Sequence, residues 1–306
     1  MRVLPDKIWS LDAVGRLFGS LLAATLLGQV VQLWVRYQPG PRTLEPAWFH
    51  LETGTAFAAL VGALVILLQR WPVEKLRARF FTLLVCVYAA LALTGLAQRG
   101  LGPAPPPSVG AMVITALFFQ GAAIPLVWWF VRQERWRLRE VFGLTRRPGH
   151  AVLLGLTAAF ACVPLGLGLN YSLAAAARVL GWELPPQTAV LIVRLAESWP
   201  DRIALAGVTI LLAPVAEELL FRGITYPLLR RFTTPTIALW GSSVVFALIH
   251  FNQLTFVPLL LLSVLLTLLY RRTGNLLAPV ACHAAFNAAN FALLFLGGLP
   301  EPDSMP

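Results

Sequence analysis

Long apolar runs separated by short polar stretches make up most of this chain. They lie at about residues 17–35, 51–68, 80–96, 109–131, 151–177, 203–229, 237–251, 256–270 and 276–296. An α-helix needs about 20 apolar residues to cross the ~30 Å hydrocarbon layer of a bilayer, and most of these runs approach that length. The pattern predicts an all-α fold, a polytopic transmembrane helical bundle with eight or nine spanning helices. The number is eight if one marginal run lies in the interface.

The composition also indicates that most of the chain lies in a lipid bilayer. Hydrophobic residues form 58% of the chain and charged residues 12%, which is about half the charged share of an average soluble domain. Because apolar runs recur along the whole chain, a soluble protein behind a single signal peptide is excluded. Proline and glycine clusters at 38–41, 102–107 and 185–186 predict loops. The stretch 188–199 is too short and too charged to span, and its apolar spacing predicts a helix on the membrane surface.

The basic residues alternate in density from loop to loop. With a cytoplasmic N-terminus, the cytoplasmic loops carry seventeen Lys and Arg residues and the opposite loops carry six. Such an excess is typical of cytoplasmic loops, so we predict that the N-terminus and the loop 132–147 face the cytoplasm. Cysteines introduced into this loop should react with an impermeant reagent only after the cells are permeabilised. Labelling of intact cells would overturn the predicted topology.

The net charge of +10 does not indicate a nucleic-acid partner, because the basic residues are divided among short loops and form no continuous stripe. The three cysteines, Cys86, Cys162 and Cys282, lie inside apolar runs without CxxC spacing. They predict neither a disulfide framework nor a cysteine zinc site.

Three charged residues depart from the pattern, because they lie inside an apolar run rather than in a loop. They are Glu217, Glu218 and Arg222, in the stretch AEELLFRG. A charge at the centre of a membrane helix costs at least ~2.5 kcal/mol, so such residues indicate a functional site. On a helix Glu218 and Arg222 can pair, whereas Glu217 points elsewhere and can act as a base or a metal ligand. A purely structural salt-bridge network between helices is the alternative interpretation.

Two histidines also lie in apolar runs. His250 ends the stretch FALIH, and His283 opens HAAFN, in which His283 and Asn287 share one helix face. At 1.5 Å per residue from the predicted cytoplasmic boundary, Glu217 and His250 lie about 20 Å deep, and the pair His283 and Asn287 about 12 to 18 Å deep. Three helices can therefore direct a glutamate, two histidines and an amide into one cavity below the membrane surface.

This set of side chains suits amide hydrolysis in two ways. A carboxylate and an imidazole can remove a proton from water, while a second imidazole and an amide stabilise the oxyanion of a tetrahedral intermediate. Alternatively, Glu217, His250 and His283 match a zinc ligand set with the fourth position open to water. The chain has no HExxH helix and no GxSxG elbow, so the familiar soluble metalloprotease and serine hydrolase motifs are absent.

Three motifs stand in order on successive predicted spans: Glu217-Glu218-x-x-x-Arg222, Phe246-x-x-x-His250 and His283-x-x-x-Asn287. Together they resemble the CAAX protease and bacteriocin-processing (CPBP, or Abi) family, which includes the type II CAAX prenyl endopeptidases. The resemblance covers about residues 195–296. We therefore expect accessory transmembrane helices at 1–150 and a CPBP-like catalytic domain at 151–300.

The resemblance implies a glutamate-dependent intramembrane endopeptidase that acts on membrane-associated substrates of the prenylated CAAX type. It implies that Glu217 activates the attacking water with help from His250, and that His283 and Asn287 line the oxyanion site or help to bind a metal, with zinc as the candidate cofactor. The expected location is the inner (plasma) membrane of a bacterium, with lipids and a membrane-associated peptide or protein as partners. Two alternatives stay open. One is a transporter or ion carrier that uses the charged cluster as a relay, and the other is a non-catalytic scaffold or immunity protein.

Overall fold

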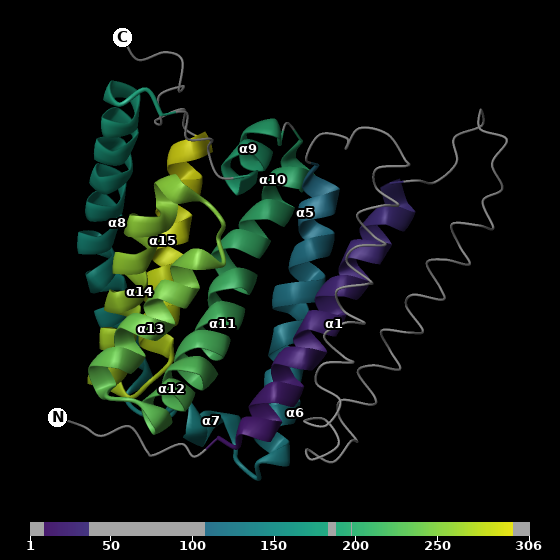
Figure 1. Cartoon of the computed structure of the whole chain (residues 1–306), viewed down its shortest axis with the longest axis vertical. Coiled ribbons are helices and arrows are strands. Elements are labelled where there is room, and N and C mark those ends of the chain that lie inside the picture. Colours follow the sequence, from purple (N-terminus) through teal and green to yellow (C-terminus); the bar gives the residue numbers. More distant parts are fainter. Residues whose placement is uncertain (1–8, 37–107, 183–187, 197, 296–306) are drawn as a thin grey trace, which may run out of the picture.

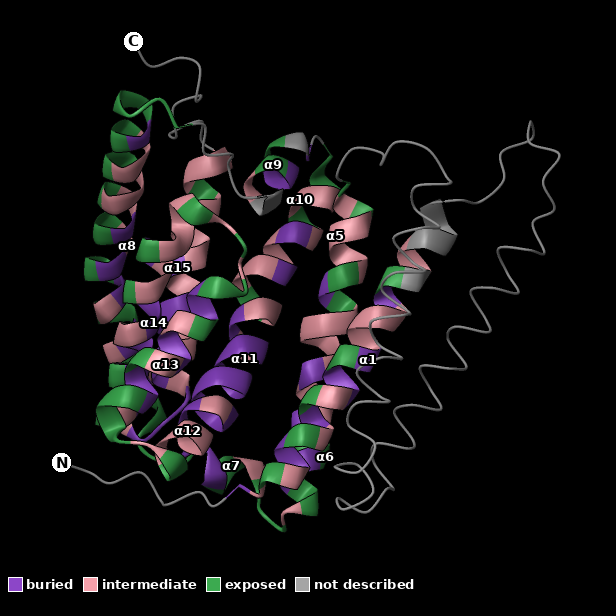
Figure 2. Ribbon diagram, in the orientation of Figure 1, coloured by how far each residue is buried: buried purple, intermediate pink, exposed green. Residues whose placement is uncertain are grey.

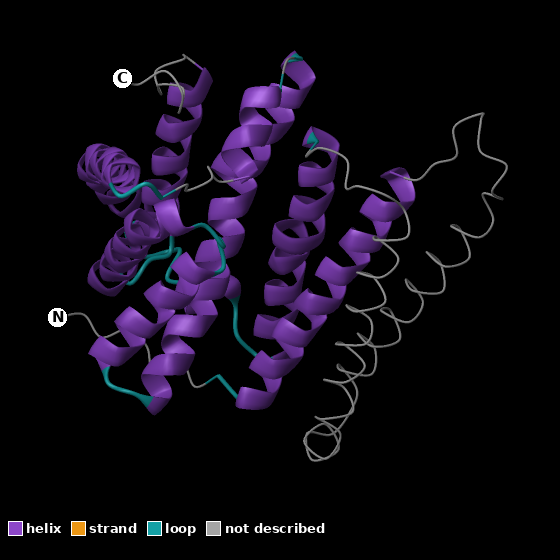
Figure 3. Cartoon of the chain, turned by 45° about the horizontal axis from the view of Figure 1, so that its top comes forward, coloured by secondary structure: helices purple, strands orange, loops and turns teal. Residues whose placement is uncertain are grey.

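The structure is a computed structural model, and it describes residues 9–36, 108–182, 188–196 and 198–295. These residues form helices joined by short loops, with no β-strand among them (Figure 3). Among the described residues, six continuous helices are long and apolar enough to cross a membrane. Two of them, Val109–Gln133 and Trp199–Phe232, each consist of several consecutive helical segments, and Pro235–Leu248 is a shorter apolar helix. The prediction of an all-α, polytopic integral membrane protein is confirmed. The runs predicted at 51–68 and 80–96 lie outside the described residues.

The helices follow the predicted runs. They are α1 (Leu11–Arg36), α5 (Val109–Ala116), α6 (Ala122–Gln133), α7 (Leu138–Val141), α8 (Pro148–Val179), α9 (Thr188–Leu195), α10 (Trp199–Ala206), α11 (Ala213–Glu218), α12 (Tyr226–Phe232), α13 (Pro235–Leu248), α14 (Gln253–Thr273) and α15 (Leu277–Phe295) (Figure 1). Three π-helical segments interrupt them: η1 (Leu117–Gly121), η2 (Gly207–Leu212) and η3 (Leu219–Thr225). The first joins α5 to α6, and the other two join α10, α11 and α12 into one continuous helix.

The predicted surface helix at 188–199 is shorter than expected. The helix α9 ends at Leu195, and Ser198 caps the next helix by accepting a hydrogen bond from the backbone N–H of Asp201 at 3.2 Å. A serine cap followed by a proline in the first turn is a strong helix start, and Pro200 occupies that place. The long helix therefore begins at Trp199 rather than near residue 203.

The predicted run at 237–251 is also helical over less than its length. Because α13 ends at Leu248, His250 lies in the turn toward α14 rather than on a helix. Asn252 begins α14 as its cap, accepting a hydrogen bond from the backbone N–H of Thr255 at 3.0 Å. The 14 residues of α13 extend for about 21 Å, less than the ~30 Å hydrocarbon layer. If Pro235 lies at the membrane boundary, the turn that holds His250 lies within the membrane.

The helices α8 and α15 pack closely through small side chains. Their shared cluster includes Ala151, Ala159 and Cys162 of α8 and Ala278, Cys282 and Phe286 of α15. Gly155 lies in the same row, where a Cβ would collide with the carbonyl of Ala278. Small residues at a helix interface let two backbones approach closely. This packing holds α15, which carries His283, against α8.

The predicted cytoplasmic loops meet at one end of the bundle. The side-chain amide of Asn275 donates to the carbonyl of Arg146 at 2.8 Å. The guanidinium of Arg231 donates to the carbonyl of Trp9 at 2.7 Å. Figure 1 shows α7 and α12 at the same end of the molecule. The described loops among those predicted to be cytoplasmic therefore lie at one end of the bundle. That this end faces the cytoplasm stays a prediction.

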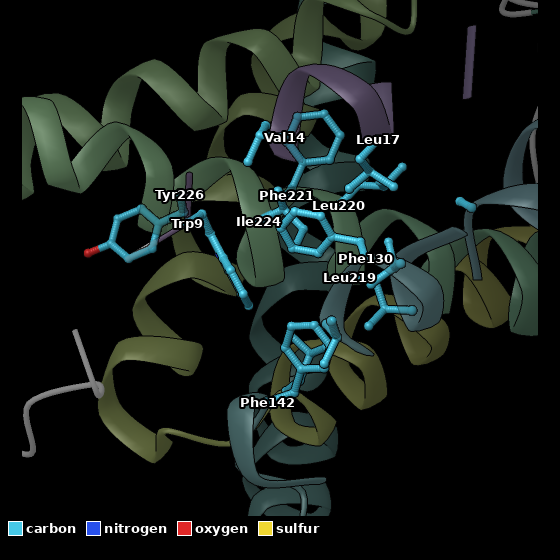
Figure 4. Packing of buried hydrophobic residues seen from close by; sticks show 14 of the residues in the cluster. Trp9, Val14, Leu17, Phe130, Phe142, Leu219, Leu220, Phe221, Ile224 and Tyr226 are labelled. Carbon is cyan, nitrogen blue, oxygen red and sulfur yellow. The ribbon is translucent and has the colours of Figure 1, made fainter. Parts of the chain in front are cut away.

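Buried residues are frequent along the long helix that contains α11 (Figure 2). Apolar side chains from this helix and its neighbours form one buried cluster. It joins Trp9, Phe130, Phe142 and Phe221, among others (Figure 4). Trp9 is 1% exposed and packs edge-on against Phe130, with ring centroids 4.8 Å apart. Residues of the predicted accessory part and of the predicted catalytic part therefore share one core.

Candidate active site

The helix that carries Glu217 and Glu218 departs twice from α-helical geometry. The segments η2 and η3 are π-helical, and they lie directly before and after α11. At their ends the N–H of Ala213 donates to the carbonyl of Val208, and the N–H of Tyr226 donates to the carbonyl of Phe221. Such π-helical turns are frequent at functional sites, because they rotate the residues that follow. The two glutamates therefore lie on a short α-helical turn between two such segments.

The structure brings Glu218 and Arg222 together in the interior. Nη1 of Arg222 donates to Oε1 of Glu218 at 2.7 Å. The side chain of Arg222 is 1% exposed and that of Glu218 is 0% exposed. Nη2 of Arg222 donates to both the carbonyl and the hydroxyl of Ser263 on α14, at 2.9 and 2.8 Å. The guanidinium also lies 4.9 Å from the centre of the Phe246 ring. These contacts compensate the burial of the guanidinium charge, which is 1% exposed.

His283 connects this ion pair to Glu217. Its Nδ1 lies 3.0 Å from Oε1 of Glu218, and its Nε2 lies 3.9 Å from Oε2 of Glu217. A carboxylate only accepts hydrogen bonds, so the proton of the neutral imidazole belongs on Nδ1, and Nε2 presents a lone pair toward Glu217. Two acceptors 3.9 Å apart do not bond directly, but one water molecule can donate a hydrogen to each. Oε2 of Glu217 and Nε2 of His283 are therefore close enough together to accept hydrogen bonds from one attacking water.

Accessibility separates Glu217 from its neighbours. Its side chain is 10% exposed and that of His283 is 4% exposed, whereas Glu218 and Arg222 are almost fully enclosed. A group that reacts with water must be reachable, whereas a group that only orients another must be held. This difference favours Glu217 as the reacting carboxylate and Glu218 as the orienting one.

The structure does not bring His250 beside Glu217. His250 is half-buried, and its Nδ1 donates to the carbonyl of Phe246 at 2.8 Å. Within the described part of the chain, no hydrogen bond or ion pair joins His250 to Glu217 or to His283. Phe246 contacts both imidazoles, with ring centroids 5.0 Å from His250 and 5.8 Å from His283. Assistance of Glu217 by His250 stays a prediction, which this arrangement does not display.

Asn287 lies one turn after His283 on α15, on the predicted face, but its amide is engaged with the protein backbone. Nδ2 of Asn287 donates to the carbonyl of Thr209 in η2 at 2.8 Å. The side chain therefore joins α15 to the helix of Glu217, on the side of α11 that precedes the glutamates.

The predicted zinc ligands do not meet as a set. Over the residues that the structure describes, no three His, Cys, Asp or Glu side chains are grouped to hold a metal ion. Glu217 and His283 are neighbours, but Nδ1 of His283 binds Glu218, and His250 binds a backbone carbonyl. We therefore assign no catalytic step to a metal.

The residues that sequence reasoning missed are those that support the cluster. Ser263 lies in an apolar run, where a serine gives no sign of the guanidinium that it binds. Trp9 resembles any tryptophan at a membrane interface, yet its indole N–H donates to the carbonyl of Gly223 at 3.1 Å. Pro227 is a signal that could have indicated the contact of Trp9, because a proline leaves a helix carbonyl without its donor.

Comparison with known proteins agrees with the motifs. Residues 199–289 match a protein-family model described as type II CAAX prenyl endopeptidase Rce1-like, which confirms the predicted resemblance. The uncharacterized protein YpbD of Bacillus subtilis (strain 168) is 38% identical over 82 residues, which cover 26% of this chain. The matched region spans 39% of the length of that relative. No solved structure matches the chain.

Proposed function

We propose that this protein is an intramembrane endopeptidase that hydrolyses peptide bonds of membrane-associated substrates of the prenylated CAAX type. The observation that carries the proposal is the 3.9 Å distance between Oε2 of Glu217 and Nε2 of His283, which lets one water donate to both. His283 is held from its other side by Glu218 at 3.0 Å. The match of residues 199–289 to a family of type II CAAX prenyl endopeptidases supports the substrate class.

Glu217 and His283 act together on the water. When the water donates one hydrogen to each acceptor, its lone pairs face away from both and toward an incoming substrate carbonyl. Glu217 takes a proton as the water oxygen attacks the carbonyl carbon, and it returns that proton to the leaving amine when the C–N bond breaks. Proton transfer by a positioned side chain accelerates such a step by about 10²- to 10⁴-fold.

Glu218 and Arg222 keep His283 in place. The hydrogen bond from Nδ1 to Glu218 fixes the tautomer and the orientation of the ring, which is the role of the buried carboxylate in a catalytic triad. Arg222, anchored on Ser263, balances the charge of Glu218 and holds it against the imidazole.

Proton transport is a second candidate function, and one observation favours it. Arg222, Glu218, His283 and Glu217 form a continuous buried series of ionisable groups. Buried ionisable side chains of membrane helices often form proton pathways. This interpretation uses the same residues without any bond cleavage.

Reconstitution in liposomes separates these functions. The purified protein is incubated with a membrane-anchored peptide that ends in a prenylated CAAX sequence, and cleavage and proton flux are recorded on the same sample. We expect cleavage without flux, and weaker cleavage of the same peptide without its prenyl group. Flux without cleavage would favour the proton pathway, and the absence of both would favour a non-catalytic scaffold.

Zinc dependence is tested by metal analysis of the same preparation. Because the described residues offer no group of three ligands, we expect full activity after chelation and dialysis, without one tightly bound zinc per chain. If zinc and activity disappear together and return together, the metal interpretation is correct, and Glu217 and the histidines would form a ligand set in the zinc-bound protein.

A further inference from the structure

Pro214 removes a backbone donor close to the candidate site. The N–H of Ala213 donates to the carbonyl of Val208, so the next carbonyl in this π-helical register is that of Thr209. Its donor would be the N–H of residue 214, which is proline and has none. The carbonyl of Thr209 therefore lacks a partner within its own helix. An unpaired backbone carbonyl inside a membrane protein is costly, because no water is available to replace the donor.

Asn287 supplies the missing donor from α15. Its Nδ2 lies 2.8 Å from the Thr209 carbonyl. A side-chain donor from outside this helix also lies close to a later proline of the helix, Pro227. Pro227 follows η3 as Pro214 follows η2. In α-helical spacing, four residues back, the N–H of residue 227 would have reached the carbonyl of Gly223. The indole of Trp9 donates to that carbonyl at 3.1 Å.

We propose that Asn287 is a positioning residue, which clips α15 to the helix of Glu217 by binding the carbonyl that Pro214 leaves free. Asn287 lies one turn from His283, and Pro214 lies three residues before Glu217. The clip thus joins the two elements that carry the reacting side chains. It fixes the depth at which Nε2 of His283 faces Oε2 of Glu217. Its effect on catalysis rests on the proposed function, whereas the hydrogen bond itself does not.

A clip and an oxyanion donor differ in what they are coupled to. An oxyanion donor acts on the substrate, so its loss does not depend on the residue at position 214. A clip acts on the Thr209 carbonyl. The loss of stability and turnover caused by Asn287→Ala should therefore be smaller when residue 214 has an N–H that can bind this carbonyl. The pair Asn287 and Pro214 therefore forms a double-mutant cycle that separates the two roles.

The experiment compares the wild type, Asn287→Ala, Pro214→Ala and the double variant in melting temperature in detergent and in peptide hydrolysis in liposomes. Loss of a hydrogen-bond partner from the interior should lower the melting temperature of Asn287→Ala by about 5 °C. Misplacement of His283 should lower its turnover by about 10- to 100-fold. In the double variant the N–H regained at position 214 can reach the Thr209 carbonyl, so at least half of both losses should be recovered.

Asn290→Ala is the matched control. Asn290 lies on the same helix, and its Nδ2 donates to the carbonyl of Phe286 in its own helix at 2.8 Å. Its removal leaves no carbonyl of a second helix without a donor. We expect a small change in melting temperature that is the same with proline or alanine at position 214.

Equal losses from Asn287→Ala in both backgrounds would overturn the clip and would assign Asn287 to the substrate. If Asn287→Ala does not fold, a folded double variant still supports the clip, and failure of both to fold rejects it. Coupling in melting temperature without hydrolysis by any of the proteins would uphold the clip and reject the proposed function. The two proposals can thus fail separately.

Discussion

Replacement of Glu217 by glutamine is expected to lower the rate of peptide hydrolysis by about 10²- to 10⁴-fold, with little change in melting temperature. Glutamine keeps the size of the side chain and one acceptor oxygen, but it cannot take a proton from water. Among the described residues the basic group closest to Glu217 is the imidazole of His283, whose Nε2 lies 3.9 Å from Oε2, so loss of the glutamate charge breaks no close ion pair. Turnover and thermal unfolding are measured on the same reconstituted or detergent-solubilised protein.

Glu140→Gln is the control for this experiment. Glu140 is an exposed residue that faces Arg137 at 3.8 Å, and its replacement should affect neither turnover nor stability. A Glu217→Gln protein that retained more than a tenth of wild-type turnover would remove Glu217 from the role of base.

The largest loss of stability is expected from Arg222→Leu. This change leaves the carboxylate of Glu218, which is 0% exposed, without its cation, and breaking such a pair costs about 3 to 5 kcal/mol. The melting temperature should fall by about 10 °C. Turnover should fall as well, because Glu218 no longer holds His283 in a fixed orientation. Thermal unfolding in detergent, followed by hydrolysis at a temperature where the variant is folded, measures both effects.

A second change tests the cause of this loss. In the double variant Glu218→Gln/Arg222→Leu no unpaired charge is left, so it should be more stable than Arg222→Leu alone. Arg137→Leu breaks an exposed pair whose side chains are 83% and 59% exposed, and should cost almost nothing. An Arg222→Leu protein as stable as Arg137→Leu would contradict the assigned role of the buried pair.

The sequence predicted the helices well, because the length of an apolar run is set by the thickness of the membrane. It also predicted which charges pair, since Glu218 and Arg222 are four residues apart on one helix and their contact needs no knowledge of other helices. Both predictions depend on local geometry alone.

The partner of Glu217 could not be predicted in the same way. Sequence spacing gives the depth of a side chain in the membrane. It does not give the direction in which that side chain points from its helix. Each residue turns an α-helix by about 100°, so the π-helical segments on either side of Glu217 change that direction. His250 was predicted at the same depth, yet α13 ends before it, and the imidazole at Glu217 is that of His283.

The bond from Trp9 to Gly223 has a consequence for the order of events during synthesis. Its two residues are separated by 214 positions, so the indole leaves the ribosome long before its acceptor. At a synthesis rate of about 5 to 20 residues per second, about 10 to 40 s pass between the synthesis of Trp9 and that of Gly223. A tryptophan is well accommodated at the membrane–water boundary during that time. The first described helix can therefore enter the bilayer early, but its end becomes buried only after the helix with Glu217 has been inserted beside it.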